Sequence, residues 1–300
     1  MAGDKGATML ETRPFGDTGL DVSIVGLGAG QIGESDVTER DAADVLNGAL
    51  DLGVTLIDTA ASYGLSEERI GRHLGHRRDE FVLSTKGGPK INGQRDWSPG
   101  SVRESIERSL RLTQSERLDI FYLHSCPLDV LRRGDLQDTL DQAVADGKIG
   151  VAGYSGDNEA LAFAAESGRF GAIETSVNIA DQWNLRNVVG KRPELGVIAK
   201  RPIANAPWRF PERPVGNYAE LYWERLRALK LDPGALDWAE LALRFTVYAP
   251  GVHTAIAGTA KLEHLRHNIA AAAGGPLDAD TLDAIDRAWL AVGSDWPAST

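Results

Sequence analysis

Cysteine is nearly absent from this sequence, because Cys126 is the only one among 300 residues. A single thiol cannot form a disulfide within the chain, so internal disulfides are excluded as a source of stability. Long apolar runs are missing too. No stretch approaches the roughly 20 apolar residues of a membrane-spanning helix, and the opening residues MAGDKGATMLETRP lack the apolar centre of a secretory signal. We therefore expect a cytoplasmic protein without a membrane partner.

Basic residues are outnumbered as well. The chain has 32 Lys and Arg against 43 Asp and Glu, a net charge of −11, and its basic residues form no cluster along the sequence. Such a charge balance repels phosphate backbones and argues against nucleic acid as a partner. The length suits one α/β barrel, which needs about 250 residues plus insertions. We expect a single domain over residues 1–300, whose oligomeric state the sequence does not indicate.

Three short apolar runs, at residues 55–58, 81–85 and 120–123, each lead to an ionisable residue. Branched and aromatic side chains followed by Gly or Pro are typical of buried parallel strands. Helical patterns separate the runs, so the strands can lie side by side with their carboxyl ends at one rim, where α/β enzymes place their chemistry. The residues that we expect to meet there are Asp58, Tyr63, Lys86 and His124.

The number of strand and helix units predicts the fold. Strands are expected at residues 22–27, 55–58, 81–85, 120–123, 149–154, 172–177, 197–199 and 254–257. Helices are expected near residues 39–52, 66–75, 98–113, 135–147, 157–167, 183–189, 235–248 and 261–272. This alternation predicts an eight-stranded parallel β/α (TIM) barrel, with an N-terminal hairpin at residues 10–20 and an extra C-terminal helix at residues 278–292.

Two segments leave alternatives open. Residues 28–33, GAGQIG, match the G-x-G-x-x-G fingerprint of an open Rossmann sheet, although the next helix starts late, near Thr38, and the tally of eight strands favours a barrel. Residues 204–234 contain four prolines and five aromatic residues and form the one irregular segment. This segment would follow the seventh strand at the active rim, where it either covers a ligand or packs on its own aromatic residues.

The four rim residues suit proton transfer to a carbonyl oxygen. Tyrosine ordinarily has a pKa of about 10, and a cation about 4 Å away stabilises the phenolate by up to ~4 kcal/mol at an effective dielectric near 20. We expect Lys86 to be this cation and Asp58 to keep it charged. His124 would donate to the same oxygen. Taken singly, each residue also fits an ordinary capping or packing role.

The sequence resembles the aldo-keto reductase superfamily over nearly its whole length. The segments RPFGDTGLDVSIVGLGAGQIG, LIDTAASYG, LSTKGG and FYLHS are similar to the family's N-terminal segment and to the stretches with its catalytic Asp, Tyr, Lys and His. The resemblance implies a β/α barrel that binds NADP(H), with NAD(H) as the alternative, and that passes hydride to a small aldehyde or ketone. Tyr63 would then protonate the carbonyl oxygen.

The resemblance also implies a set of cofactor-binding residues. They are Ala29, Gly30, Gln31, Ser155, Glu174, Lys200, Arg201, Gly258, Thr259, Lys261, His264 and Asn268. Some depart from the family's pattern: Gly156 follows Ser155 where an Asn is usual, and Glu174 stands where a Gln is common. Gly258 and His264 replace cations that bind the 2′-phosphate, which leaves Lys261 to compensate. We expect the Glu174 carboxylate to favour the oxidised, cationic nicotinamide.

The remaining chemistry-bearing residues fit more than one role. Trp97 and Trp208 are expected to line the substrate pocket, with Trp296 as a further candidate, and core packing is the alternative for all three. Two His-x-x-His pairs lack acidic or cysteine partners, so we expect no metal site. A non-enzymatic alternative is an NADP-binding regulatory or partner-binding protein with little turnover, because fold does not fix function.

Overall fold

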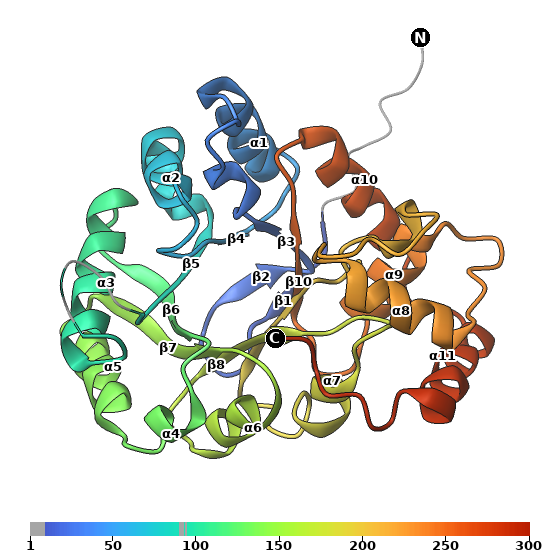
Figure 1. The fold of residues 1–300 in the computed structure, drawn as a ribbon. Coiled ribbons are helices and arrows are strands. Elements are labelled where there is room, and N and C mark those ends of the chain that lie inside the picture. The colour runs from blue at the N-terminus through green and yellow to red at the C-terminus, as the bar shows by residue number, and fades with distance from the viewer. Residues whose placement is uncertain (1–9, 90–92, 94) are drawn as a thin grey trace, which may run out of the picture.

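Eight parallel strands close into a barrel in this computed structural model, which describes residues 10–89, 93 and 95–300. Helices surround the barrel (Figure 1). The strands run in the closed order β10-β3-β4-β5-β6-β7-β8-β9. Their bounds are β3 (Val25–Gly28), β4 (Leu56–Asp58), β5 (Val82–Gly87), β6 (Leu118–His124), β7 (Ile149–Ser155), β8 (Ala172–Ser176), β9 (Gly196–Lys200) and β10 (Thr254–Gly258). The predicted eight-stranded β/α barrel is confirmed, and the Rossmann alternative, which needs an open sheet, is wrong.

Helices follow the strands largely as predicted. They are α1 (Glu39–Asp51), α2 (Ser66–Leu74), α3 (Pro99–Leu112), α5 (Asp135–Ala145), α6 (Asn158–Glu166), α7 (Trp183–Asn187), α9 (Trp238–Val247), α10 (Leu262–Ala272) and the extra α11 (Ala279–Val292). A short helix, α4 (Leu128–Leu131), and two 3₁₀ turns, η1 (Gln31–Gly33) and η2 (Gly75–Glu80), complete this part of the chain. Local sequence explains the start of α1, because the Thr38 side chain accepts a hydrogen bond from the Asp41 N–H.

The first predicted strand is divided between two elements. Residues 21–23 form β2 (Asp21–Ser23), which pairs antiparallel with β1 (Thr12–Pro14), whereas the barrel strand β3 begins only at Val25. Ser23 explains the break, because its hydroxyl donates to the Val25 carbonyl at 2.8 Å and its N–H donates to the Thr55 hydroxyl at 2.8 Å. The hairpin is therefore longer, and the first barrel strand shorter, than the sequence predicted.

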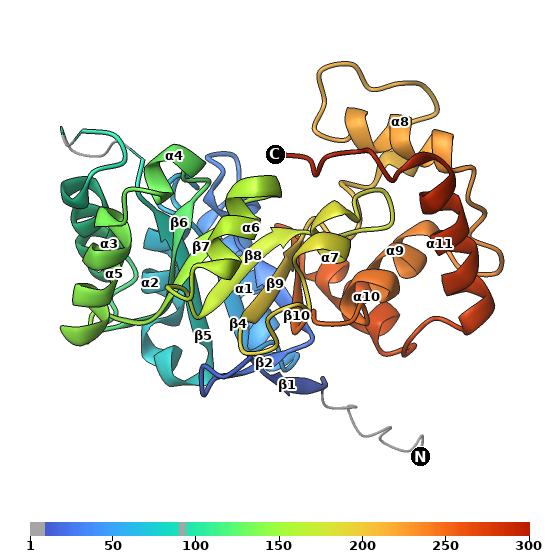
Figure 2. The ribbon, with the colours of Figure 1, turned by 90° about the horizontal axis from the view of Figure 1, so that it is seen from below.

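The segment 204–234 is not wholly irregular, contrary to the sequence-based expectation. It contains a 3₁₀ turn, η3 (Pro207–Arg209), and a ten-residue helix, α8 (Glu220–Leu229). Tyr222 and Leu229 lie buried on one face of α8, so the helix is held by an apolar stripe that the flanking prolines obscured in the sequence. Figure 2 shows α8 on the same side of the barrel as the C-terminus, opposite β1 and β2.

The hairpin closes the amino-terminal end of the barrel. Inside the barrel lies a separate apolar cluster, made of Phe15, Val22, Leu56, Ile120, Tyr122, Ala172, Ile198 and Ile256. Phe15 is fully buried, and a Cβ on Gly196 would lie 2.3 Å from its ring, so glycine is needed at the base of β9. A larger apolar core fills the space between the strands and the helices. Within the described part of the chain, no helix has the length and apolarity needed to cross a bilayer.

Replacing Phe15 with alanine should lower the free energy of unfolding by about 3–5 kcal/mol, because the cavity would open where the hairpin plugs the barrel. Urea denaturation followed by circular dichroism measures the change. Val215→Ala is the control, since Val215 is 80% exposed and its truncation should have little effect. Equal stability of the two variants would show that the hairpin contributes no core packing.

Candidate active site

The structure brings Asp58, Tyr63, Lys86 and His124 together at the carboxyl rim of the barrel. Asp58 and His124 end β4 and β6, Lys86 lies near the end of β5, and Tyr63 lies in the loop after β4. The Lys86 ammonium contacts the Asp58 carboxylate and lies 5.5 Å from the centroid of the Tyr63 ring. The rings of Tyr63 and His124 meet edge to face, with 5.9 Å between their centroids. The four side chains can therefore act on one small molecule.

Lys86 is buried between two carboxylates rather than one. Its Nζ contacts the Asp58 carboxylate, donates to the Thr59 carbonyl at 3.1 Å and lies 3.0 Å from Glu174 Oε2. Lys86, Asp58 and Glu174 are each 1% exposed. Two of these contacts are hydrogen bonds, to Asp58 and to Thr59, whereas the contact with Glu174 is an ion pair, because Glu174 Oε2 has no hydrogen-bond partner among the described residues. The Ser84 hydroxyl completes the cluster by donating to Asp58 Oδ1 at 2.8 Å.

The two carboxylates govern the protonation of the cluster. Burial favours the neutral amine, but Asp58 and Glu174 outweigh it and hold the pKa of Lys86 above its ordinary value. Burial and the neighbouring Glu174 raise the pKa of Asp58 to about 7, against the opposing effect of Lys86. The cluster consequently keeps its cation over the whole neutral range.

Tyr63 does not become more acidic than an ordinary tyrosine, contrary to the expectation from its lysine neighbour alone. Lys86 lowers the pKa of Tyr63, but burial and the charges of Asp58 and Glu174 together outweigh it, so the pKa lies above its ordinary value. Burial and the charge of Lys86 lower the pKa of His124 to about 4. At neutral pH the imidazole is therefore uncharged, and it can still offer one N–H donor.

The glycine-rich turn after β3 supports Tyr63. A Cβ on Gly33 would lie 1.8 Å from the Tyr63 carbonyl oxygen, and one on Gly30 would lie 3.6 Å from the Tyr63 ring. The Gly33 carbonyl accepts from the Leu65 N–H at 3.0 Å. The fingerprint-like glycines thus allow two backbones to approach closely, and they lead into a 3₁₀ turn rather than into α1, which begins at Glu39. Ala29 lies in the same turn, and its N–H donates to the Asp58 carbonyl at 2.7 Å.

Ser155 lies beside the cluster. It pairs in register with His124 on one side and with Glu174 on the other, and its buried hydroxyl has no hydrogen-bond partner among the described residues. A buried unsatisfied hydroxyl at a rim marks a place for a polar ligand group. The next residue is glycine for a local reason, because a Cβ on Gly156 would lie 2.5 Å from the Tyr154 hydroxyl.

The turn that follows β9 has strained backbone and two cations. Arg201, Ala204, Asn205 and Ala206 all have positive φ, between 49° and 59°, a conformation that costs energy in residues other than glycine and clusters at functional sites. Lys200 is paired with Asp157 at 3.0 Å. Arg201 Nη1 donates to the Ser299 carbonyl at 2.8 Å, and to the hydroxyls of Ser176 and Tyr222 at 3.4 Å.

The end of β10 meets the glycine-rich turn. A Cβ on Gly258 would lie 2.4 Å from the side-chain oxygen of Gln31, so these two predicted cofactor residues touch. The Thr259 hydroxyl accepts from the Lys261 N–H at 3.0 Å and lies 3.3 Å from His264 Nδ1. Asn268 is buried on α10. The structure therefore gathers the residues predicted around the start of α10, on the side of the barrel next to β3.

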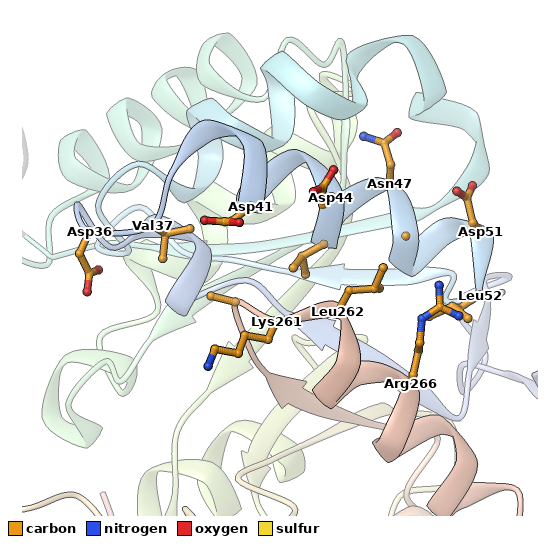
Figure 3. A pocket seen from close by; sticks show the side chains of 13 residues that line it. Asp36, Val37, Asp41, Asp44, Asn47, Asp51, Leu52, Lys261, Leu262 and Arg266 are labelled. Carbon is orange, nitrogen blue, oxygen red and sulfur yellow. The ribbon is translucent and has the colours of Figure 1, made fainter.

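Lys261 also lines a groove of about 730 Å³ between α1 and α10. Figure 3 shows Asp41, Asp44 and Asp51 along α1, across from Leu262 and Arg266. The wall formed by α1 is acidic, which disfavours an anionic group at this point.

The two predicted substrate residues occupy different surroundings. Trp97 is half-buried, and a Cβ on Gly88, just after β5, would lie 2.5 Å from its ring. This contact puts Trp97 close to the strand that carries Lys86. Trp208 instead stacks on Trp238, with 6.0 Å between ring centroids, and packs in the cluster between α8 and α9. Core packing therefore accounts for the contacts of Trp208, and its contact with substrate stays a prediction.

Asp157 is a rim residue whose importance the sequence did not reveal. Besides the pair with Lys200, its carboxylate accepts from the Ser176 N–H at 2.9 Å and from the Asn184 side chain at 2.8 Å. Its position before α6 suggests a helix cap, yet its side chain makes no capping bond. The sequence does not reveal this role, because the pair of Asp157 and Lys200 forms only when the fold places β8 and β9 beside Asp157.

Replacing Lys86 with methionine should lower the free energy of unfolding by about 3–5 kcal/mol at pH 8, because two carboxylates lose their buried counter-ion. The loss should shrink toward pH 5. The pKa of Asp58 is already raised to about 7 with Lys86 present. Below pH 7 the folded protein therefore holds a proton on Asp58, whereas Asp58 of the unfolded chain, with a pKa near 4, stays ionised until the pH falls to about 4. Urea denaturation at both pH values measures this.

The control for this variant is Lys148→Met, because Lys148 is paired with Glu107 on the surface, where its side chain is 42% exposed. This change should have far less effect on stability. A pH-independent loss for Lys86→Met, or one no larger than in the control, would contradict the buried three-charge cluster.

Comparisons with known proteins agree with this geometry. Residues 24–290 match the Aldo/keto reductase family. The uncharacterized oxidoreductase YqkF of Bacillus subtilis is 26% identical, with 92% of this chain and 95% of YqkF covered. Aldo-keto reductase AKR11C1 from Bacillus halodurans, in its holo form, is 25% identical with a TM-score of 0.79, covering 93% of this chain and 96% of AKR11C1.

A Klebsiella pneumoniae aldo/keto reductase in complex with NADP and acetate is also 25% identical, with a TM-score of 0.72 over 93% of this chain and 95% of that one. The family match spans most of the sequence, and the structural likeness extends over the whole barrel. The chain belongs to the aldo/keto reductase family.

Proposed function

We propose that this protein is an NAD(P)H-dependent oxidoreductase that reduces an aldehyde or ketone to an alcohol. The observation that carries the proposal is the buried Lys86–Asp58 pair with the Tyr63 and His124 rings beside it at the carboxyl rim. Family membership supports it, as do the oxidoreductase names of relatives. The substrate proposed is a small carbonyl compound.

The rim residues fit a nicotinamide dinucleotide. The unpartnered Ser155 hydroxyl suits a carboxamide, and the turn at residues 201–206 combines left-handed backbone with the Lys200 and Arg201 side chains, a combination that suits a pyrophosphate. The cofactor would supply the hydride. Thr259, Lys261, His264 and Asn268 would hold its adenosine end, as the resemblance implies.

Tyr63, Lys86 and His124 would each have a different role in the proton transfer. Tyr63 would donate its hydroxyl proton to the substrate oxygen as hydride arrives at the carbon. Lys86 would lower the cost of the resulting phenolate, because its charge lowers the pKa of Tyr63 more than the charge of Arg201 does. His124, neutral because burial lowers its pKa to about 4, would orient the substrate oxygen with a ring N–H.

We infer a preference for NADP(H), with NAD(H) as the alternative. The Klebsiella neighbour was solved with NADP, and Lys261 offers a cation at the start of α10. Against this, the α1 wall of the groove beside Lys261 carries Asp41, Asp44 and Asp51 (Figure 3). Titrating both cofactors against the protein decides between them.

One observation favours the binding-protein alternative. The Lys86 ammonium donates to Asp58 and Thr59 and forms an ion pair with Glu174, and among the described residues it donates no hydrogen bond to the Tyr63 hydroxyl. A protein that binds NADP and seldom turns over would show this arrangement. The two functions differ in whether cofactor is consumed.

Tyr63→Phe should reduce carbonyl reduction by about 10²- to 10⁴-fold, because the proton donor is lost, while cofactor binding changes little. The measurement follows reduced cofactor at 340 nm with a panel of aldehydes. Tyr218→Phe, at an 89% exposed tyrosine, is the matched control and should keep full activity. If the wild type binds NADPH but consumes none with any carbonyl, the protein is a binding protein rather than a reductase.

Glu174→Gln should weaken binding of the oxidised cofactor relative to the reduced one by about tenfold, because the carboxylate beside the Lys86 ammonium no longer offsets the positive nicotinamide. Fluorescence titration gives both dissociation constants. Glu174→Asp retains the charge and should stay close to the wild-type ratio. An unchanged ratio in Glu174→Gln would remove Glu174 from the neighbourhood of the nicotinamide ring.

A further inference from the structure

Residues 294–300, which we name the C-terminal strap, leave α11 and return across the barrel. Figure 1 places the C-terminus over the middle of the barrel, and Figure 2 places it on the side of α8, away from the hairpin. The strap thus lies above the rim that carries the candidate active site. An extended segment without helix or strand keeps such a position only when other residues hold it.

Aromatic and guanidinium contacts hold the first half of the strap. The Trp296 ring meets the ring of Trp289 on α11 edge to face, with 5.6 Å between centroids. The Arg225 guanidinium of α8 lies 5.2 Å from the Trp296 centroid, and its Nη2 donates to the Pro297 carbonyl at 2.6 Å. The strap is therefore tied to α8 and α11.

Backbone hydrogen bonds hold the second half on the rim. Ala298 exchanges two bonds with the Asn158 side chain, at 2.7 and 3.0 Å. The Ser299 N–H donates to Asp181 Oδ2 at 2.9 Å. The Ser299 carbonyl accepts from Arg201 Nη1 at 2.8 Å and from the Ser176 hydroxyl at 3.4 Å. The second half of the strap thus makes five hydrogen bonds with four rim residues.

Arg201 connects the strap to the proposed cofactor site. It opens the left-handed turn at residues 201–206, and Ser176 stands two residues beyond Glu174 on β8, on the same face of the strand. The three hydrogen bonds of Arg201 all use one nitrogen, Nη1, and the shortest, at 2.8 Å, goes to the strap. A phosphate beside this turn would draw the same guanidinium, because a guanidinium–phosphate pair joins two full charges and can be bidentate, whereas the Ser299 carbonyl is neutral.

We propose that the strap is a latch that competes with the dinucleotide's phosphates for Arg201, so that cofactor binds fully only after Ser299 has released the guanidinium. The inference rests on the proposed function, because it needs a dinucleotide at this rim. It adds a coupling between two sites, and coupling of binding is reciprocal. Weakening the strap must tighten cofactor binding, and cofactor must loosen the strap.

The first test weakens the strap without touching Arg201. Asn158→Gly removes both bonds to Ala298, and glycine accepts the left-handed backbone that Asn158 adopts at φ +60°. Trp296→Ala is a second, independent variant that removes the contacts with Trp289 and Arg225. Ser294→Ala is the control, because the Ser294 hydroxyl, within the part of the chain that the structure describes, bonds only to the Leu290 carbonyl one turn earlier.

Calorimetric titration with NADP⁺ should give a dissociation constant about tenfold lower in Asn158→Gly and in Trp296→Ala than in the wild type, since one hydrogen bond to a charged group is worth roughly that factor. Ser294→Ala should match the wild type. Unchanged or weaker binding in both latch variants would overturn the latch. Absence of NADP⁺ binding in every protein, the wild type included, would overturn the proposed function and the latch with it.

Amide hydrogen exchange supplies a readout that needs no turnover. The N–H groups of Ala298 and Ser299 are both hydrogen-bonded in the latched strap. Saturating NADP⁺ should speed exchange of a peptide covering residues 296–300 in the wild type, and Asn158→Gly should show the fast rate without NADP⁺. Slower exchange on adding NADP⁺ would mean that cofactor strengthens the strap, which contradicts competition for Arg201.

Discussion

A buried ammonium between two buried carboxylates is the interaction on which the site depends. Lys86 contacts Asp58 and lies 3.0 Å from Glu174 inside the carboxyl rim. Removing such charges from water costs several kcal/mol each, so the cluster survives only because the barrel fixes β4, β5 and β8 around it. The same arrangement raises the pKa of Asp58 and holds that of Lys86 high. Charge, not only shape, decides how Tyr63 behaves.

Close backbone packing and ion pairs surround this cluster at the rim. The glycine-rich turn lets the Tyr63 loop approach through Gly33, where any side chain would collide with the backbone. Asp157 pairs with Lys200, and the Arg201 guanidinium is held by the strap. Lys200 and Arg201 therefore already have partners, and an anionic cofactor would have to compete with these partners for them.

The barrel could be predicted from sequence because strand and helix patterns alternate, and parallel strands bring their ends to one rim. The pattern could not divide residues 22–27 between the hairpin and β3, since the turn depends on Ser23 bonding to the distant Thr55. The sequence pattern also failed to predict α8, because prolines flank this helix. For the site, the strand ends indicated which residues meet. Lys86 and Glu174 are 88 positions apart in sequence. Their contact arises only when the strands close into a barrel, and nothing in the sequence indicates it. The net effect on Tyr63 depends on burial, which sequence does not report.

The charge of Lys86 can be measured directly. Nitrogen-15 NMR of the lysine side chains follows the Nζ signal with pH, and Lys86→Arg assigns it. Ordinary lysines lose their proton near pH 10.4. The account predicts that the Lys86 signal stays that of an ammonium beyond this pH, because Asp58 and Glu174 hold its pKa above the ordinary value. A signal that titrates at or below the ordinary pKa would contradict the buried cluster on which the site depends.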